Sequence, residues 1–318
     1  MIYKSLHNGD PMPAIGLGTW KSSTQSVYDA VFHALKNGYQ HVDCAPIYMN
    51  EKPVGKAISD ALAHHHVSRE QLWVTSKLWN SYHAPEDVMP ALKQTLHFMQ
   101  LDYLDAYLIH WPVACKRQCQ YGHVTTSSDY IALSDLPLHT TWEAMIECQK
   151  AGLSRHIGVS NCSISKIEDL IDKTNTTPSI NQIEYHPYLN QQALRDYCQE
   201  KRICLTAYSP LGSNDRPPQL KAPNEPPLLT NDTVVDIAHQ QNASAAQVLI
   251  AWSLAQGNAV IPKSTHPDRI DQNLASLHLD LSAEQLTQLS NLNLDYRFVK
   301  GVFFEIPGSP YTVKELWS

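Results

Sequence analysis

The stretch Leu72-Trp73-Val74-Thr75-Ser76-Lys77-Leu78 is the strongest indication of the fold, because it predicts a buried strand with a lysine near its end. A buried ammonium group is costly unless an opposite charge pairs with it. Two further strand-like runs also end on polar side chains, residues 39–43 on Asp43 and residues 103–110 on His110. Polar residues gathered at the carboxyl ends of successive strands are typical of the active site of a (β/α)8 barrel.

Strand-like and helical patterns alternate along the whole chain. Apolar residues at helical spacing, such as those between Val27 and Leu35, separate the strand-like runs. The predicted strands are residues 15–20, 39–43, 72–78, 103–110, 157–160, 179–184, 204–208 and 259–261. Eight strands, each followed by a helical pattern, indicate an α/β fold with a closed parallel barrel. We therefore expect a single (β/α)8 TIM barrel domain over residues 1–318.

The competing α/β architecture is an open, doubly wound sheet. That architecture usually carries a G-x-G-x-x-G turn after its first strand. Here Gly16-Leu17-Gly18 continues as Thr-Trp-Lys-Ser, so the third glycine is missing. The sequence favours the barrel.

Four segments lie outside the repeat. Residues 1–13 contain Asn8-Gly9-Asp10 and predict a hairpin that caps the barrel floor. Residues 111–139 and 211–229 are long loops after the fourth and seventh strands, and loops of this length are usually functional. The apolar tail from residue 297 onward should lie across the barrel mouth.

Composition and charge narrow the possible partners. A net charge of −7 argues against nucleic acid or an anionic membrane surface as the main partner. The start of the chain has no signal-peptide core, and residues 243–262 are too polar to cross a membrane. Seven cysteines without a C-x-x-C pair suit reduced thiols. We expect a cytoplasmic monomer.

Asp43, Tyr48, Lys77 and His110 form a candidate catalytic group. A phenol with a pKa of about 10 is a poor acid at neutral pH. A neighbouring ammonium is expected to lower that pKa, while a carboxylate holds the lysine charged. Such a tyrosine can donate a proton to a carbonyl oxygen, which a histidine can orient. The alternative is that the four residues are unrelated: a loop cap, a surface tyrosine and a core histidine.

Several motifs, in the right order along nearly the whole chain, resemble the aldo-keto reductases. They are Gly18-Thr19-Trp20, Gly38-Tyr39-Gln40-His41-Val42-Asp43-Cys44-Ala45 with Tyr48, Thr75-Ser76-Lys77-Leu78-Trp79, Leu108-Ile109-His110-Trp111-Pro112, Ile157-Gly158-Val159-Ser160-Asn161 and Ile261-Pro262-Lys263-Ser264. The resemblance implies a TIM barrel that reduces aldehydes and ketones with NADPH and without a metal. It implies that Tyr48 is the general acid, that Lys77 and Asp43 tune it, and that His110 positions the carbonyl.

Residues 263–273 predict an anion site. Pro267 suits a helix start, and Arg269, Gln272 and Asn273 then fall on one helical face, after Lys263 and Ser264. Cations, a hydroxyl and a helix amino terminus together favour an anion. A solvated helix start is the plainer alternative. The resemblance places the adenosine 2′-phosphate here, although family members often carry an acidic residue in place of Gln272.

The resemblance implies further cofactor contacts. Gly18, Thr19, Trp20 and Asp43 belong to this set through the matching motifs. A clamp on the nicotinamide carboxamide is implied for Ser160, Asn161 and Gln182. Tyr208 resembles the ring that stacks on the nicotinamide. The stretch that binds the pyrophosphate is implied to contain Ser209, Leu211 and Ser213. Asp215 resembles the acidic residue that closes a loop over the cofactor by pairing with Lys21 and Lys263.

The substrate pocket is expected to be aromatic, and suited to apolar aldehydes with one polar end. Its predicted lining is Trp20, Tyr48, Trp79, His110 and Trp111. Some relatives use a tail arginine to attract carboxylated aldehydes, but only Lys300 and Lys314 follow Arg297 as cations here. The long fourth loop is closest to aldehyde and aldose reductases.

Two signals predict no metal site. His64, His65 and His66 are consecutive, so they point to different sides of a helix. Cys115 and Cys119 have no second pair that would complete a zinc site.

Two other functions stay open. One is an isomerase or lyase of phosphosugars, which usually uses a glutamate or a Schiff-base lysine. The other is a non-catalytic relative that binds NADPH.

Overall fold

Eight parallel strands form the centre of the molecule in the computed structural model, which describes residues 1–121 and 124–318. Their order in the sheet is β12, β11, β10, β9, β6, β5, β4 and β3. The Ile15–Val260 bridge and the bond from Gly18 N to Pro262 O (3.1 Å) join the two edges. This closure confirms the predicted barrel. The strands are β3 (Leu17–Gly18), β4 (His41–Asp43), β5 (Trp73–Leu78), β6 (Leu104–Ile109), β9 (Ser154–Ser160), β10 (Ile180–Glu184), β11 (Cys204–Tyr208) and β12 (Ala259–Val260).

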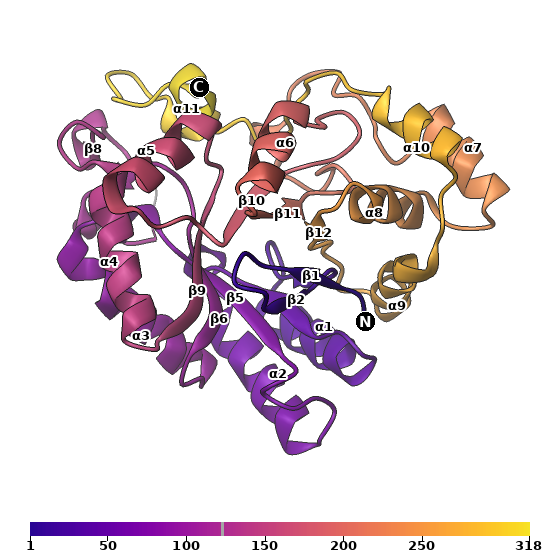
Figure 1. The fold of residues 1–318 in the computed structure, drawn as a ribbon, viewed down its shortest axis with the longest axis horizontal. Helices are drawn as coiled ribbons and strands as arrows, with labels where there is room; N and C mark the ends of the chain where they lie inside the picture. The colour runs from indigo at the N-terminus through magenta and orange to yellow at the C-terminus, as the bar shows by residue number, and fades with distance from the viewer. Residues whose placement is uncertain (122–123) are drawn as a thin grey trace.

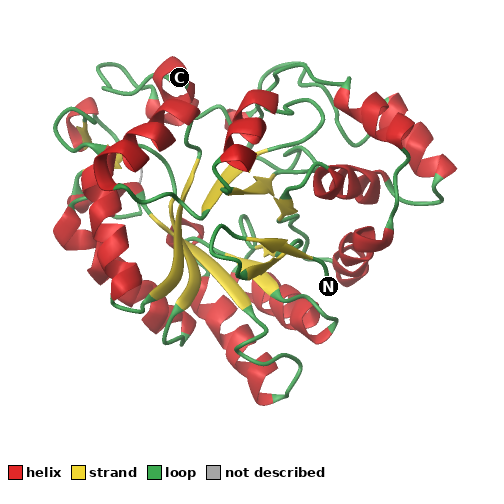
Figure 2. Ribbon diagram, viewed as in Figure 1, coloured by secondary structure: helices red, strands yellow, loops and turns green. Residues whose placement is uncertain are grey.

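Helices surround the strands, as Figures 1 and 2 show. The surrounding helices are α1 (Thr24–Lys36), α2 (Glu51–Ala63), α3 (Pro85–Met99), α4 (Leu138–Lys150), α5 (Ile164–Thr174), α6 (Gln192–Glu200), α8 (Ala245–Ala255) and α9 (Pro267–Ala275). Two more, α7 (Asp232–Gln240) and α10 (Ala283–Ser290), pack against α8 and against each other. In the described residues, no helix is long and apolar enough to span a membrane.

Local sequence explains where these helices begin and how closely they pack. The Ser23 side chain caps α1 by accepting from Ser26 N, and the buried face of α1 carries the predicted apolar residues. In α2, a Cβ on Gly55 would lie only 2.4 Å from the Met99 Cα. Glycine therefore lets α2 approach the end of α3 more closely than any side chain would permit.

The amino-terminal hairpin closes the barrel floor, as predicted. Strands β1 (Tyr3–Ser5) and β2 (Pro11–Pro13) pair antiparallel. Leu6 and Met12 are buried with Trp73, Leu108 and Ile180, which come from the barrel strands. The barrel is therefore plugged at this end, and ligands can reach its interior only from the carboxyl ends of the strands.

The other irregular segments are more ordered than expected. The connection after β6 contains a short antiparallel pair, β7 (Ala114–Cys115) with β8 (Tyr130–Ile131), and α4 begins at Leu138, before the predicted loop end. The tail forms a 3₁₀ turn at Val302–Phe304 and ends in α11 (Val313–Trp317). Its residues Phe304, Tyr311 and Leu316 pack in one cluster with Trp111, which places the tail over the barrel mouth.

Candidate functional site

One cavity of about 1190 Å³ opens at the carboxyl ends of the strands. Its lining contains each predicted site residue except Lys77, which lies buried behind it. These residues come from most strands of the barrel, from the connections that follow them and from the irregular segment at 211–229. They are Gly18, Thr19, Trp20, Asp43, Tyr48, Trp79, His110, Trp111, Ser160, Asn161, Gln182, Tyr208, Ser209, Leu211, Ser213, Asp215, Lys263, Ser264, Arg269, Gln272 and Asn273.

Lys77 joins Asp43 to Tyr48. Its ammonium nitrogen lies 2.6 Å from Asp43 Oδ1, 2.8 Å from the Cys44 carbonyl and 3.5 Å from the Tyr48 hydroxyl. Asp43 ends β4, which pairs in parallel with β5, and Lys77 lies two residues beyond the partner of Asp43 on β5. Since neither charged side chain meets solvent, each depends on the other for compensation.

The Tyr48 phenol is protonated in the resting chain. Burial raises its pKa well above the ordinary value, and the Asp43 and Cys44 groups raise it further. The sequence-based expectation of a lowered pKa is therefore wrong for this state. The reason is that Asp43 offsets the charge of Lys77, while the hydroxyl loses the water that would stabilise a phenolate.

His110 is neutral. Burial lowers its pKa well below the ordinary value, and the charges of Lys77 and His83 act in the same direction. Its ring meets the Tyr48 ring edge-on at 5.9 Å and the Trp79 ring at 5.2 Å between centroids. A neutral imidazole can donate a hydrogen bond, but it carries no excess proton to give away. Tyr48 is thus the better placed proton donor of the two.

The residues predicted to clamp a carboxamide are bonded to one another. Asn161 Nδ2 donates to the His110 carbonyl at 3.0 Å, and the Tyr208 hydroxyl donates to Asn161 Oδ1 at 2.7 Å. The Ser160 hydroxyl donates to the Gln182 carbonyl at 2.8 Å. The Gln182 amide also reaches Asp43, at 2.6 Å from Oδ2. Sequence reasoning missed this last contact, because nothing in either motif indicates the other as its partner.

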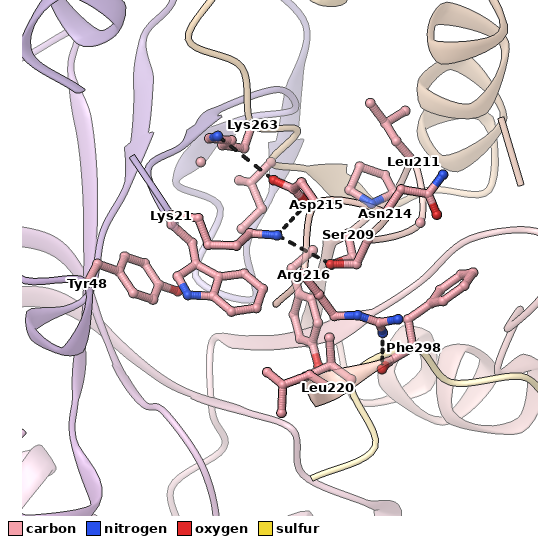
Figure 3. A pocket seen from close by; sticks show the side chains of 18 of the residues that line it. Lys21, Tyr48, Ser209, Leu211, Asn214, Asp215, Arg216, Leu220, Lys263 and Phe298 are labelled. Carbon is pink, nitrogen blue, oxygen red and sulfur yellow. Dashed lines mark hydrogen bonds and ion pairs between the residues drawn. The ribbon is translucent and has the colours of Figure 1, made fainter. Parts of the chain in front are cut away.

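The clasp loop, residues 211–229, lines the cavity, and Figure 3 shows its side chains Asn214, Asp215 and Arg216 there. Asp215 accepts a hydrogen bond from Lys21 and lies 3.9 Å from the Lys263 ammonium. Lys21 is also 3.5 Å from the Ser213 hydroxyl. Burial alone would raise the pKa of Asp215, but the two lysines outweigh it and lower that pKa. The structure thus brings together the three residues that the sequence predicts as a clasp.

The predicted anion site lies at the far end of the cavity. Helix α9 begins at Pro267, as expected, and Arg269, Gln272 and Asn273 line the cavity from it. The Ser264 hydroxyl accepts a bond from His266 N at 3.1 Å. With Lys263 beside it, this end of the cavity carries two cations and a helix amino terminus, which suits a phosphate group.

Three residues that line the cavity have left-handed backbone conformations. Lys21, Asn161 and Ser209 have positive φ values of 61°, 61° and 49° although none is glycine. Such conformations cost free energy and persist where the surrounding structure enforces them, often at functional sites. Their left-handed backbone fixes the turns that aim these three segments at the cavity.

Aromatic side chains form the walls near Tyr48. The Trp20 ring lies 6.4 Å from that of Tyr48. Trp111 contacts Phe303 and Phe304 of the tail, with centroids 5.7 and 5.2 Å apart. The predicted aromatic pocket is therefore present, with tail aromatics that sequence reasoning did not name as lining residues.

Comparisons with known proteins agree with this geometry. The profile of the "Aldo/keto reductase family" matches residues 14–294. An aldo/keto reductase from Synechocystis sp. is 45% identical over 317 residues, covering 100% of this chain and 96% of that protein. Aldo-keto reductase family 1 member A1 from Sus scrofa is 43% identical, covering 92% and 90%. The structure of the aldose reductase from Schistosoma japonicum superposes with a TM-score of 0.87 at 35% identity, covering 96% of each chain.

Proposed function

Because the chain belongs to the aldo/keto reductase family, whose members are oxidoreductases acting on small carbonyl compounds, we propose that it reduces aldehydes and some ketones to alcohols with NADPH. Its likeness to an aldose reductase structure supports aldehydes as substrates. The observation that carries the proposal is the contact of Lys77 with both Asp43 and Tyr48 at the cavity bottom. In this proposal those three residues and His110 form the catalytic machinery.

The cavity suits a dinucleotide phosphate cofactor, which when bound supplies a hydride to the carbonyl carbon. Lys21, Lys263 and Arg269 provide positive charge along the cleft, where phosphate groups need it. The Arg269 end favours a cofactor with a 2′-phosphate, hence NADPH over NADH. The side chain expected to contact the adenine is the uncharged Gln272, at a position where family members often carry an acidic residue.

Tyr48 would provide the proton. As hydride arrives at carbon, negative charge develops on the carbonyl oxygen and makes that oxygen a strong base. The phenol can then transfer its proton although its resting pKa is raised, because the Lys77 ammonium, 3.5 Å away, stabilises the phenolate that forms. Asp43 pairs with the Lys77 side chain and orients it by their 2.6 Å contact.

His110 would orient the substrate. Its neutral ring can donate a hydrogen bond to the same oxygen that receives the Tyr48 proton. The aromatic walls formed by Trp20, Trp79 and Trp111 exclude water and favour apolar or aromatic aldehydes. The seven cysteines form no disulfide among themselves, which supports a reducing compartment such as the cytoplasm.

The test compares wild-type protein with Tyr48→Phe. Consumption of NADPH, and separately NADH, is followed by nicotinamide absorbance over a panel of aldehydes, ketones and sugars. The variant should lose at least ~10²-fold in turnover, as expected for a missing general acid, and keep its NADPH affinity. Near-normal turnover in the variant would rule out the role of Tyr48. NADPH binding without turnover on any substrate would instead favour a non-catalytic protein.

A further inference from the structure

Arg216 links the clasp loop to the carboxyl-terminal tail (Figure 3). Its side chain is almost fully buried and lines the cavity one residue after Asp215. One terminal guanidinium nitrogen donates to the Phe298 carbonyl, and the second terminal nitrogen lies 2.5 Å from the Glu225 carboxylate. Because Glu225 neutralises it within the loop, Arg216 is better suited to hold a carbonyl than to attract a phosphate.

The tail root, residues 298–299, is fixed from its other side by the barrel. Glu184, the last residue of β10, accepts from Phe298 N at 2.6 Å and from Val299 N at 2.8 Å. Burial would raise the pKa of Glu184, but bonds from His186 and the backbone lower it, so the carboxylate stays charged. Arg216 therefore binds a segment that is also hydrogen-bonded to a barrel strand.

Packing reinforces the same contact. A Cβ on Gly212 would lie 3.4 Å from the Phe298 ring, so the clasp loop rests directly against that ring. The Arg216 guanidinium carbon is 5.2 Å from the ring centroid. The cavity wall continues from the tail root through Val302, Phe303 and Phe304, the residues beside Trp111.

We propose that Arg216 is a positioning residue that couples cofactor binding to the shape of the substrate pocket. This inference rests on the proposed function. Closure of the clasp loop through Asp215 sets Arg216 against the Phe298 carbonyl, and that bond holds the tail in the position from which it walls the pocket. Because coupling free energies are reciprocal, a ligand in the substrate pocket must tighten cofactor binding by the same factor.

The experiment measures that factor without turnover. Benzamide, an aromatic carbonyl compound that hydride transfer from a nicotinamide does not reduce, is titrated into the protein with and without NADP⁺, and tryptophan fluorescence reports its dissociation constant. In wild-type protein NADP⁺ should tighten benzamide binding about tenfold, within the usual range of coupling between sites. In Arg216→Met the factor should fall below about twofold, and the KM for an aldehyde should rise with kcat maintained.

Two further variants separate this role from a general structural one. Arg155→Met is the matched control, because Arg155 also covers an aromatic ring, that of Tyr103, and pairs with a carboxylate, that of Asp105, but at the opposite end of β9 from the cavity. Its coupling factor should equal that of wild type. Arg216→Lys keeps a charge that can make one of the two bonds, and it should recover part of the coupling. Melting temperatures show whether each variant is folded.

Wild-type coupling in Arg216→Met would overturn the proposal, even if NADP⁺ affinity falls, since Arg216 would then serve the clasp alone. If Arg216→Met does not fold, Arg216→Lys decides the question, and full wild-type coupling in that variant overturns the proposal. The test is independent of the proton donor: Tyr48→Phe should keep the coupling factor while losing turnover. Failure of the proposed reaction and failure of the coupling are therefore distinguishable.

Discussion

Gln182 donates a hydrogen bond of 2.6 Å to Asp43 across the barrel mouth, from β10 to β4. Asp43 thus accepts this bond with one carboxylate oxygen and a bond from Lys77 with the other. Both side chains are buried, so the geometry of the carboxylate is fixed by protein groups alone. Gln182, which the sequence predicts as a cofactor contact, therefore also holds the carboxylate that pairs with Lys77.

Replacing Gln182 with methionine should change the pH dependence of turnover. Burial raises the pKa of Asp43, while Lys77 and the Gln182 amide oppose that rise. Without the amide the pKa of Asp43 rises further, so the carboxylate protonates at a higher pH and Lys77 loses its partner sooner. The acid limb of the kcat/KM profile should move up by about one pH unit, the value of one hydrogen bond to a charged group.

The matched control for this variant is Gln149→Met. Gln149 also donates from its side chain to an oxygen, the Arg155 carbonyl, but on the exposed outer surface. Its pH profile should coincide with that of wild type. An acid limb that stays in place in Gln182→Met would show that the amide does not tune Asp43.

Removing Lys77 should damage both stability and chemistry. Lys77→Met leaves the Asp43 carboxylate buried without its cation, and breaking a buried pair costs about 3–5 kcal/mol of unfolding free energy. Turnover should fall at least ~10²-fold, because no charge remains beside Tyr48 to stabilise its phenolate. Chemical denaturation and steady-state kinetics measure the two effects.

The double variant Asp43→Asn with Lys77→Met separates them. With both charges gone, no ion is left unpaired, so much of the lost stability should return. Turnover should stay low, because the ammonium is still absent. If turnover returned together with stability, Lys77 would have only a structural role.

Glu51 should make stability depend on pH. This carboxyl group, in the first turn of α2, accepts hydrogen bonds from Ser76 at 3.0 Å and Thr95 at 3.4 Å. Burial raises its pKa from 4.5 to about 7. The folded chain therefore holds this proton more tightly than the unfolded chain, and the resulting stability is lost as the pH rises from the ordinary value through about 7. The loss should reach roughly 3 kcal/mol.

Glu51→Gln should flatten this part of the stability profile, since an amide cannot lose a proton. Urea denaturation at pH values from below 4.5 to above 7 measures the free energy of unfolding across the window given by the pKa shift. The exposed Glu143, replaced by glutamine, is the control and should leave the slope unchanged. Parallel profiles for wild type and Glu51→Gln would contradict the prediction.

The sequence predicted the barrel because its strands are continuous apolar runs between clear helix patterns. The sequence was less informative about the exact bounds of individual strands. The strand expected at residues 15–20 shrinks to Leu17–Gly18, and Ile15 forms only an isolated bridge with Val260. Strand β9 starts three residues early, at Ser154, because pairing with Leu104 outweighs its polar Ser-Arg-His start.

Helix α2 has a weak helical pattern in its sequence, because Pro53 and Gly55 interrupt it. Pro53 lies in the first turn, where a missing N–H costs little, and Gly55 is required by the approach to Met99. The two-residue strands β7 and β8 are too short to leave a periodic signal. In each case a tertiary contact decides what the local sequence leaves ambiguous.

The candidate site shows the same division. Motifs in the sequence indicated the residues that the cavity collects, but they could not indicate the bonds between them. The contacts from Gln182 to Asp43 and from Arg216 to Phe298 join segments that are 139 and 82 positions apart. The raised pKa of Tyr48 likewise depends on burial, which no spacing of residues reveals.

Asp43 and Lys77 lie on strands of the barrel. The aromatic residues Trp111, Phe303 and Phe304 lie on segments outside the sheet. This separation has a consequence for engineering. Under the proposed function, grafting a foreign connection or a foreign tail onto this scaffold should change which compounds are accepted and leave the contact between Asp43 and Lys77 in place. Substrate selectivity can accordingly change during evolution while the residues on the strands stay the same.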